Sequence, residues 1–408
     1  MKLFTKYIEP NKKLRTIEII VLIALVLVSL FNFTRGLLKV YSNPGDLTYL
    51  NTIQMVRDAK EEDYDEDSTL CDVIYKNDDA QMIVTYPYEE YVELDEEDTV
   101  DAHVYKTSDD TMLYFNEMDP SAESIQKTYS NIMAENMAST FNLAISLFIL
   151  ALSLCVVLFF GKFFTTYEKS WFTSIMVLAT IVSVIFPEES ANGVSGIIIM
   201  LLYLLDTLLN ILCELLISKQ SRYNFLVSVA VEITEILICF VLMYRFATMA
   251  VTLFFWLPID ILSFINWTKH KDEQEDELTV VRRLKGYQEV LVILGIAIWT
   301  LGVGYFLSGL DIRTDFLGGN RFLELAIIYL DACASAVGVA NGLFIFFRLR
   351  EQWIAWYICA ILESIMNILA GQYVLLVLKL GYFTNTTYGY IKWSKYIKNH
   401  KVEDNSLF

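Results

Sequence analysis

Long runs of apolar residues constrain the fold of this chain more than any other feature. Of its 408 residues, 55% are hydrophobic, and the mean hydropathy is +0.43. The runs are about twenty residues long, which is the length that an α-helix needs to cross a hydrocarbon core of about 30 Å. A soluble chain of this size would break its apolar residues into shorter, amphipathic patterns. The sequence therefore predicts an all-α membrane protein that crosses the bilayer many times.

Ten of these runs are predicted to span the membrane. The first, at about residues 17–33, follows several lysines and is not followed by a small-residue cleavage site, so we expect an uncleaved anchor. Basic residues of the short loops fall on one side, which predicts that both termini are cytoplasmic. The nine further spans are expected at about residues 138–160, 168–187, 193–217, 223–244, 247–267, 288–309, 322–347, 352–370 and 372–391.

Two segments of the chain have similar endings. Phe264–Lys269 and Tyr390–Lys395 share an aromatic residue, an isoleucine, a tryptophan and a lysine at equivalent positions. Each ending closes a block of three apolar runs, at 191–270 and 319–396. A cytoplasmic loop and one linker helix, within 271–318, separate the blocks. This spacing predicts two parallel three-helix repeats joined by one inverting helix, a 3+1+3 arrangement.

A polar segment at residues 40–130 accounts for the whole net charge of the chain. Between Asp46 and Lys127 there are twenty-four acidic and five basic residues, against a formal net charge of −18 for the whole chain. This acidity argues against nucleic-acid binding. Strand patterns at 70–76, 81–91, 100–107 and 112–116, with helical spacing at 47–60, predict a small extracellular α+β domain with a solvated acidic loop at 58–67.

The other predicted regions are a cytoplasmic N-terminus with its anchor helix (1–39), two accessory helices (131–190) and a cytoplasmic tail (397–408). For the acidic domain three interpretations stay open. It is a stabilising or docking module, it captures a cation or substrate, or it binds a partner protein.

The chain lacks the motifs of the common enzyme classes. No Walker A, Gly-x-Ser-x-Gly or His-Glu-x-x-His pattern occurs, and no Asp-x-Asp-x-Asp-Gly spacing suggests a calcium loop. The three histidines are scattered along the chain, which disfavours a metal site. We therefore expect no catalysis, no metal and no cofactor. A different class of function stays open, in which the external domain is the ligand-binding part of a membrane receptor or sensor.

Several motifs together resemble one known family. Phe254–Asp260 precedes Phe264–Trp267, a Gln-Trp-x-x-Trp element stands at Gln352–Trp356, and Tyr388–Trp393 reads Tyr-Gly-Tyr-Ile-Lys-Trp. In this order they resemble the PnuC family of vitamin-precursor transporters, over about residues 165–398. The resemblance implies a fold similar to that of the SWEET sugar transporters, in the cell membrane.

The resemblance also implies a function and partners. It implies facilitated uptake of a vitamin precursor, with nicotinamide riboside expected and thiamine or another cationic vitamin or nucleoside as alternatives. Phosphorylation by a cytoplasmic kinase would then trap the substrate, and the protein would be a homo-oligomer, with trimers known in the family. At Val229 and Ala360 the chain departs from the family, which has asparagine in many members.

Acidic residues within the predicted spans are the main functional signal. Asp206, Asn210 and Glu214 recur every four residues and so share one helix face. A carboxylate at the bilayer centre costs about 2.5–3.5 kcal/mol on insertion scales, so such groups face a cavity or a partner. A cavity lined by acids and tryptophans suits a flat, cationic ligand. The predicted substrate site comprises Asp206, Asn210, Glu232, Trp256, Asp260, Asp331, Gln352, Trp353, Trp356, Glu363 and Asn367.

Structural roles compete with this interpretation. Lys379 could form an ion pair with Glu363, and Glu214 could extend toward Lys219 and Arg222 at the membrane surface. Trp267 and Trp393 are expected to be interfacial anchors. The sequence leaves open whether an ion is coupled to transport.

Overall fold

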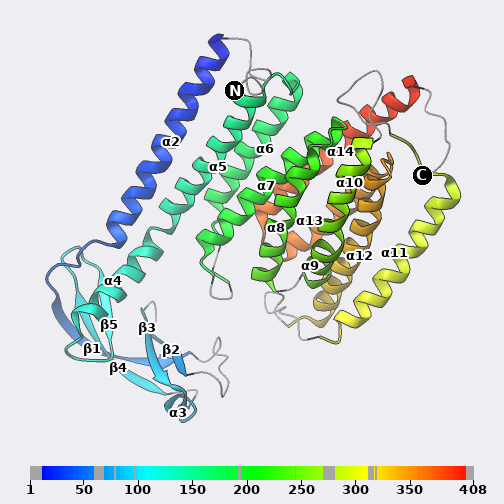
Figure 1. The fold of residues 1–408 in the computed structure, drawn as a ribbon. Coiled ribbons are helices and arrows are strands. Elements are labelled where there is room, and N and C mark those ends of the chain that lie inside the picture. Colours follow the sequence, from blue (N-terminus) through cyan, green and yellow to red (C-terminus); the bar gives the residue numbers. More distant parts are fainter. Residues whose placement is uncertain are drawn as a thin grey trace. The chain divides into compact units, whose positions relative to one another are not determined.

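The computed structural model describes residues 12–58, 69–77, 80–95, 98–188, 190–191, 194–243, 245–269, 281–310, 317 and 319–400. The chain forms two compact units (Figure 1). One comprises residues 1–33 and 139–408, and the other comprises residues 34–138. Part of the predicted acidic loop, most of the loop after residue 269, the loop at 311–316 and the end of the tail lie outside the described residues.

The larger unit is built from long helices. Eight of them agree with the predicted spans to within a few residues, whereas the first and the last are longer than predicted. Nine helical segments in the described part of the chain are long and apolar enough to cross a membrane. The helices are α2 (Lys12–Val40), α5 (Ala138–Phe160), α6 (Thr166–Ile185), α7 (Gly196–Ser218), α8 (Asn224–Leu242), α9 (Phe246–Val251), η2 (Thr252–Trp256), α10 (Leu257–Lys269), α11 (Gly286–Leu307), α12 (Arg321–Phe346), α13 (Gln352–Leu369) and α14 (Tyr373–His400).

The tenth predicted span, α14, is helical but is not among these nine segments. Its polar residues lower its hydropathy, and Lys379, Asn385 and Thr386 are each at most 7% exposed. The helix packs against α6, α7 and α13. Its polar face therefore contacts protein rather than lipid, and a hydropathy criterion undervalues a helix in such a position.

Six helices form a closed ring. Successive contacts run from α7 to α8, α10, α12, α13 and α14, and α14 returns to α7. The third helix of each predicted block thus packs against the first helix of the other block. Helix α11 packs on α12 outside this ring, and most of its apolar surface is exposed. Ring closure brings side chains from both blocks around one interior.

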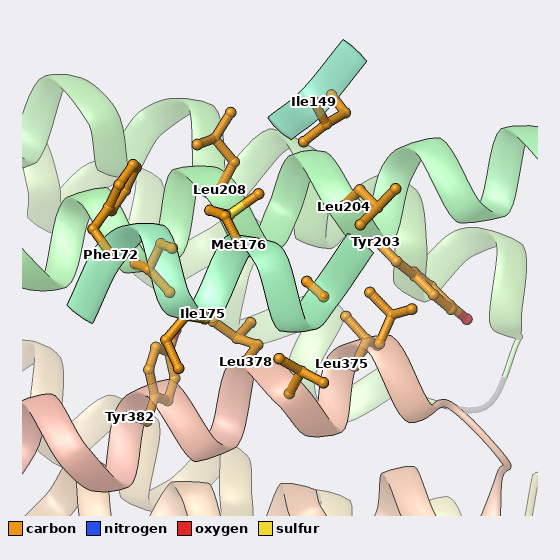
Figure 2. Close-up of a cluster of buried hydrophobic side chains, with 14 of the residues drawn as sticks. Ile149, Phe172, Ile175, Met176, Tyr203, Leu204, Leu208, Leu375, Leu378 and Tyr382 are labelled. Atoms are coloured by element: carbon orange, nitrogen blue, oxygen red, sulfur yellow. The ribbon is translucent and has the colours of Figure 1, made fainter. Parts of the chain in front are cut away.

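A large hydrophobic core joins α6 to the ring (Figure 2). Phe172, Ile175 and Met176 of α6 lie between side chains of α7 and α14. Leu204 on one side and Leu378 on the other are at most 1% exposed. Helix α6 begins with a capping box in which Thr165 and Glu168 bond each other's backbone. The accessory helix is therefore a packed part of the larger unit.

The turns that follow α7 and α12 have the same backbone hydrogen bonds. Gln220 and Arg348 both have left-handed φ values, 57° and 60°. In each turn this residue's N–H bonds the carbonyl three residues back, and the next N–H reaches five back. This is the Schellman ending of a helix. Left-handed residues also follow α8 and α13, at Met243 and Gly371. Gln220 and Arg348 are 128 positions apart in the sequence, and so are Met243 and Gly371.

The smaller unit contains one antiparallel sheet in the order β3-β2-β1-β4-β5. Its strands are β1 (Thr48–Arg57), β2 (Leu70–Asn77), β3 (Ala80–Pro87), β4 (Thr99–Lys106) and β5 (Met112–Phe115). Helices α3 (Tyr88–Tyr91) and α4 (Ala122–Asn136) complete the unit. The α+β class and the four predicted strand regions are confirmed.

A single carboxylate ties the β4–β5 turn to both flanking helices. Hydrogen bonds from Lys39, Thr107, Tyr129 and Thr111 hold the pKa of Asp109 below its usual range. The Tyr129 hydroxyl donates to Asp109 at 2.9 Å. Charged-group hydrogen bonds of this kind fix the turn against α4.

The predicted helix at 47–60 is wrong, because this segment forms the central strand β1. It pairs with β2 on one side and with β4 on the other. Leu50 and Val56, two of the residues on which the helical spacing rested, are 45% and 46% exposed, whereas Met55 is fully buried. Strand pairing on both edges outweighs a weak helical pattern. The predicted strand at 81–91 is also too long, since it ends at Pro87 and α3 follows.

Candidate functional site

The helical ring encloses a cavity of about 90 Å³. Side chains from all six ring helices line it, together with residues from α9, η2 and the turn before α9. Seven of the eleven predicted site residues are among them, namely Asp206, Asn210, Glu232, Trp256, Asp260, Trp356 and Glu363. The cavity is therefore the place where most of the predicted site comes together.

The polar stripe of α7 faces the cavity. Thr234 of α8 donates a hydrogen bond to the Asp206 carboxylate at 2.9 Å. The Tyr382 hydroxyl of α14 donates to Asn210 Oδ1 at 2.5 Å. One turn further, the Asn385 amide donates to Glu214 Oε2 at 2.7 Å. Spacing along one helix thus indicated the correct face, and each residue receives its partner from a neighbouring helix.

Helices α8 and α10 add three more carboxyl groups. The Thr252 hydroxyl of η2 donates to Glu235 at 3.1 Å. Glu232 and Asp260 are 4% and 2% exposed, and Glu232 Oε2 and Asp260 Oδ2 have no hydrogen-bond partner. Ser228 lies beside both of these carboxyl groups. This side of the cavity is acidic, and of its three carboxyl groups Glu235 interacts with the basic residues Arg245 and Lys379.

Two basic residues also line the cavity. Lys379 of α14 forms an ion pair with Glu363 of α13. Arg245, in the turn before α9, has its Nη2 atom 3.9 Å from Glu363 Oε2. Both basic side chains are at most 8% exposed. The predicted alternative, a Glu363–Lys379 ion pair, is confirmed, and the pair forms part of the cavity lining.

Two tryptophans face each other across the cavity. The rings of Trp256 and Trp356 have centroids 6.3 Å apart and planes inclined by 20°. Trp256 ends the π-helical turn η2, two residues before Pro258. Proline has no N–H for the usual bond to the carbonyl four residues back, which favours a widened turn before it. Glycines on α12 leave room for this turn, since a Cβ at Gly342 would lie 2.5 Å from the Phe255 ring.

Four predicted site residues do not line the cavity. Asp331 is 1% exposed and accepts hydrogen bonds from the N–H groups of Ala247 and Thr248, at 2.9 and 3.3 Å, at the start of α9. Asn367 is buried elsewhere on α13, and Gln352 and Trp353 are buried at the start of that helix. Asp331 therefore has the position of a helix cap.

The predicted interfacial anchors are wrong. Trp267 and Trp393 are 0% exposed, with ring centroids 6.1 Å apart, and Trp353 packs against Trp393 at 5.6 Å. The Trp267 indole donates to the carbonyl of Ile345 at 2.8 Å. The paired endings thus meet in one buried cluster rather than at the lipid surface. Glu214 likewise does not extend to Lys219 but is buried beside Asn385.

Arg245 and Tyr382 are two of the cavity residues that the predicted site did not include. Arg245 falls between the predicted spans 223–244 and 247–267, on the side that is poor in basic residues, and a lone arginine there was a signal that it has a partner inside the protein. Tyr382 stands three residues after Lys379 and so shares its helix face, but no motif marked it. Both line the cavity.

Comparisons with known proteins converge on one family. The family model described as nicotinamide mononucleotide transporter matches residues 200–395, which span α7 to α14. The nicotinamide riboside transporter PnuC of Neisseria mucosa is 24% identical over 245 residues, covering 58% of this chain and 84% of the relative. PnuC of Haemophilus influenzae is 23% identical over 191 residues, covering 46% and 76%.

A solved structure also matches. The crystal structure of the vitamin B3 transporter PnuC is 21% identical, covers 59% of this chain and 95% of its own, and has a TM-score of 0.46. Over α7 to α14 this chain is therefore similar to the PnuC family of membrane transporters, and both of these curated relatives are transporters rather than enzymes.

Proposed function

We propose that the protein carries nicotinamide riboside across the membrane by facilitated diffusion, and that the ring cavity is the substrate site. One observation carries the proposal: two facing tryptophans and six carboxyl groups line the same buried space, against two basic residues. Nicotinamide riboside is a small, polar molecule with a flat ring that bears a positive charge. Both curated relatives are named as transporters of this compound, which supports the choice of substrate.

The two tryptophans are suited to a flat ring. A ring stacked between two parallel rings requires about 7 Å between them, twice the contact distance of carbon atoms. The ring centroids of Trp256 and Trp356 are 6.3 Å apart, so the distance between the ring planes is at most this value and the two rings must move apart to admit the nicotinamide ring. A cation over an indole face gains up to about 2 kcal/mol when it is desolvated. The tryptophans would therefore recognise both the shape and the charge of the ring.

The carboxyl groups are suited to the positive charge. Glu363 is already paired with Lys379, whereas Glu232 and Asp260 have unpartnered oxygens. We therefore assign the ring's charge to the side formed by α8 and α10. Asp206 and Asn210 are assigned to the polar part of the substrate, since their side chains face the cavity from α7.

The proposal also covers the arrangement of the helices in the membrane, the retention of the substrate and the oligomeric state. We infer a 3+1+3 arrangement with both termini in the cytoplasm and the acidic domain outside. The matching Schellman turns after α7 and α12 support the repeat. Facilitated diffusion only equalises concentrations, so a cytoplasmic kinase that phosphorylates the substrate would retain it. The family resemblance supports a homo-oligomer, with a trimer as the expected form.

Uptake by proteoliposomes tests the function. Labelled nicotinamide riboside should equilibrate across the membrane with neither ATP nor an ion gradient, and unlabelled compound should compete. Trp356→Leu should reduce the uptake rate at least tenfold, because stacking is lost on one side. The comparison variant is Trp299→Leu on α11. This ring is 41% exposed and its indole donates to Ser335 at 3.1 Å, so its loss leaves the stacked pair intact and should change uptake much less than Trp356→Leu. Failure of the wild-type protein to take up the compound would refute the function. A loss of uptake in Trp299→Leu but not in Trp356→Leu would refute the assignment of the site.

A further inference from the structure

The cavity contains more negative groups than the structure neutralises. Six carboxyl groups line it, and Lys379 and Arg245 are the basic residues in the lining that the structure describes. Both basic residues lie near Glu363. If all six acids were ionised, four negative charges would remain uncompensated in a buried space. Burying an unpaired charge is so unfavourable that such a group takes up a proton instead.

Hydrogen bonding separates these acids into two classes. Asp206, Glu235 and Glu214 accept bonds from Thr234, Thr252 and Asn385, and each of these donors lies on a neighbouring element. Glu363 has its ion pair. Glu232 and Asp260 each have an oxygen without a partner. One oxygen of Glu214 is also unpartnered, but the other accepts from an amide.

The remaining titratable groups of the lining offer no positive charge to this pair. Cys213 of α7, Cys359 of α13 and Tyr382 of α14 are neutral groups in their ordinary state. Helices α8 and α10 pack together, and Ser228 lies beside both Glu232 and Asp260. Two neighbouring acids without a counter-ion behave as one unit that shares a proton.

We propose that Glu232 and Asp260 form a proton-binding pair, and that the positive ring of the substrate displaces this proton when it binds. The inference rests on the proposed function and adds to it a proton that competes with the substrate for the site. In the empty cavity one carboxyl O–H bond holds the proton. When the cationic ring enters, that bond breaks, the proton leaves to solvent, and the carboxylate becomes the counter-ion of the ring. Substrate and proton therefore compete for one site.

Competition has a measurable consequence. If one proton is released for each substrate bound, the binding constant falls about tenfold for each unit by which the pH is lowered in the range where the pair is protonated. Transport itself remains downhill for the substrate. A facilitator without this pair would show no such pH dependence of binding.

Two measurements test the pair, and the first needs no substrate. Infrared spectra of the purified, empty protein at neutral pH should contain the carbonyl band of a protonated carboxyl group. Glu232→Gln and Asp260→Asn should each weaken or shift this band, because each removes one of the two carboxyl groups that share the proton. The matched control Glu214→Gln, a buried acid with an amide partner, should keep it. Absence of the band in the wild-type protein, or its loss only in Glu214→Gln, would overturn the proposal.

The second measurement is calorimetric titration with nicotinamide riboside in two buffers of different ionisation enthalpy. The wild-type protein should release about one proton for each substrate bound, and Glu232→Gln should release none. Binding without proton release would overturn the exchange, although the proposed function would stand. If nicotinamide riboside does not bind, the proposed function fails, and the infrared band still decides whether the pair holds a proton.

Discussion

The two three-helix groups of the ring have similar turns but different chemistry. In the first group, α7, α8 and α10, the acids have hydroxyl or amide partners or none, and no basic side chain of these helices lines the cavity. In the second, α12, α13 and α14, the cavity acid Glu363 is paired with Lys379. Groups with similar turns thus line the cavity differently. The helices of the first group contribute acids without an ion pair, and those of the second contribute an acid paired with a lysine. The difference suggests that the first group binds the substrate charge, whereas the second group holds the ring together.

The largest test of this difference is to remove Lys379. Lys379→Met should leave Glu363 buried with only the more distant Arg245, at 3.9 Å. Breaking a buried ion pair from one side lowers stability by about 3–5 kcal/mol, and we expect about 3 kcal/mol because Arg245 compensates in part. The apparent melting temperature of the detergent-solubilised protein measures this loss.

A double variant provides the control for this loss. Lys379→Met with Glu363→Gln should recover much of the stability, because neither charge is then left alone. If the double variant is as unstable as the single one, the pair is not what stabilises the second group. The comparison between the two groups would then lose its main support.

The second test concerns the equivalent positions Ser263 and Gly389, which precede the paired endings. A Cβ at Gly389 would lie 2.5 Å from two atoms of the Trp353 ring, and this ring is fully buried. Gly389→Ala should therefore destabilise the protein by about 1–3 kcal/mol, the usual effect of overpacking. At Ser263 the first group already accommodates a larger side chain at 0% exposure.

Gly381, on the same helix, is the matched control for this effect. A Cβ there meets its nearest atom at 3.5 Å, so Gly381→Ala should change the melting temperature little. Equal effects at the two glycines would contradict the role of the tryptophan cluster. They would indicate instead that any added side chain on helix α14 changes the stability, wherever it lies.

Some of these features were predictable from the sequence, for physical reasons. Spans such as α7 were predictable because apolar length alone determines whether a helix crosses a bilayer. The face of α7 with Asp206 and Asn210 followed from helical spacing. Partners such as Thr234 and Tyr382 were not predictable, because spacing within one helix says nothing about which neighbour packs against it. The strand β1 was missed because its partners lie far away in the sequence.

The sequence also did not reveal which element packs against Asp331, and this residue provides the last test. It and Asp206 lie in the first helices of the two groups, and both were predicted to bind substrate. In the structure Asp206 lines the cavity, whereas Asp331 accepts bonds from the first N–H groups of α9. A carboxylate at a helix N-terminus contributes up to about 2 kcal/mol in a partly buried site.

The two aspartates should therefore respond in opposite ways to the same substitution. Asp331→Asn keeps one acceptor oxygen and should lower stability by about 1 kcal/mol while leaving the affinity for nicotinamide riboside unchanged. Asp206→Asn should weaken affinity several-fold with little change in melting temperature, since Thr234 can still donate to the amide oxygen. Melting curves and substrate titrations of both variants would decide this. An Asp331→Asn protein with normal stability and weak binding would place the second group, too, in the substrate site, because the cap would then not be what Asp331 provides.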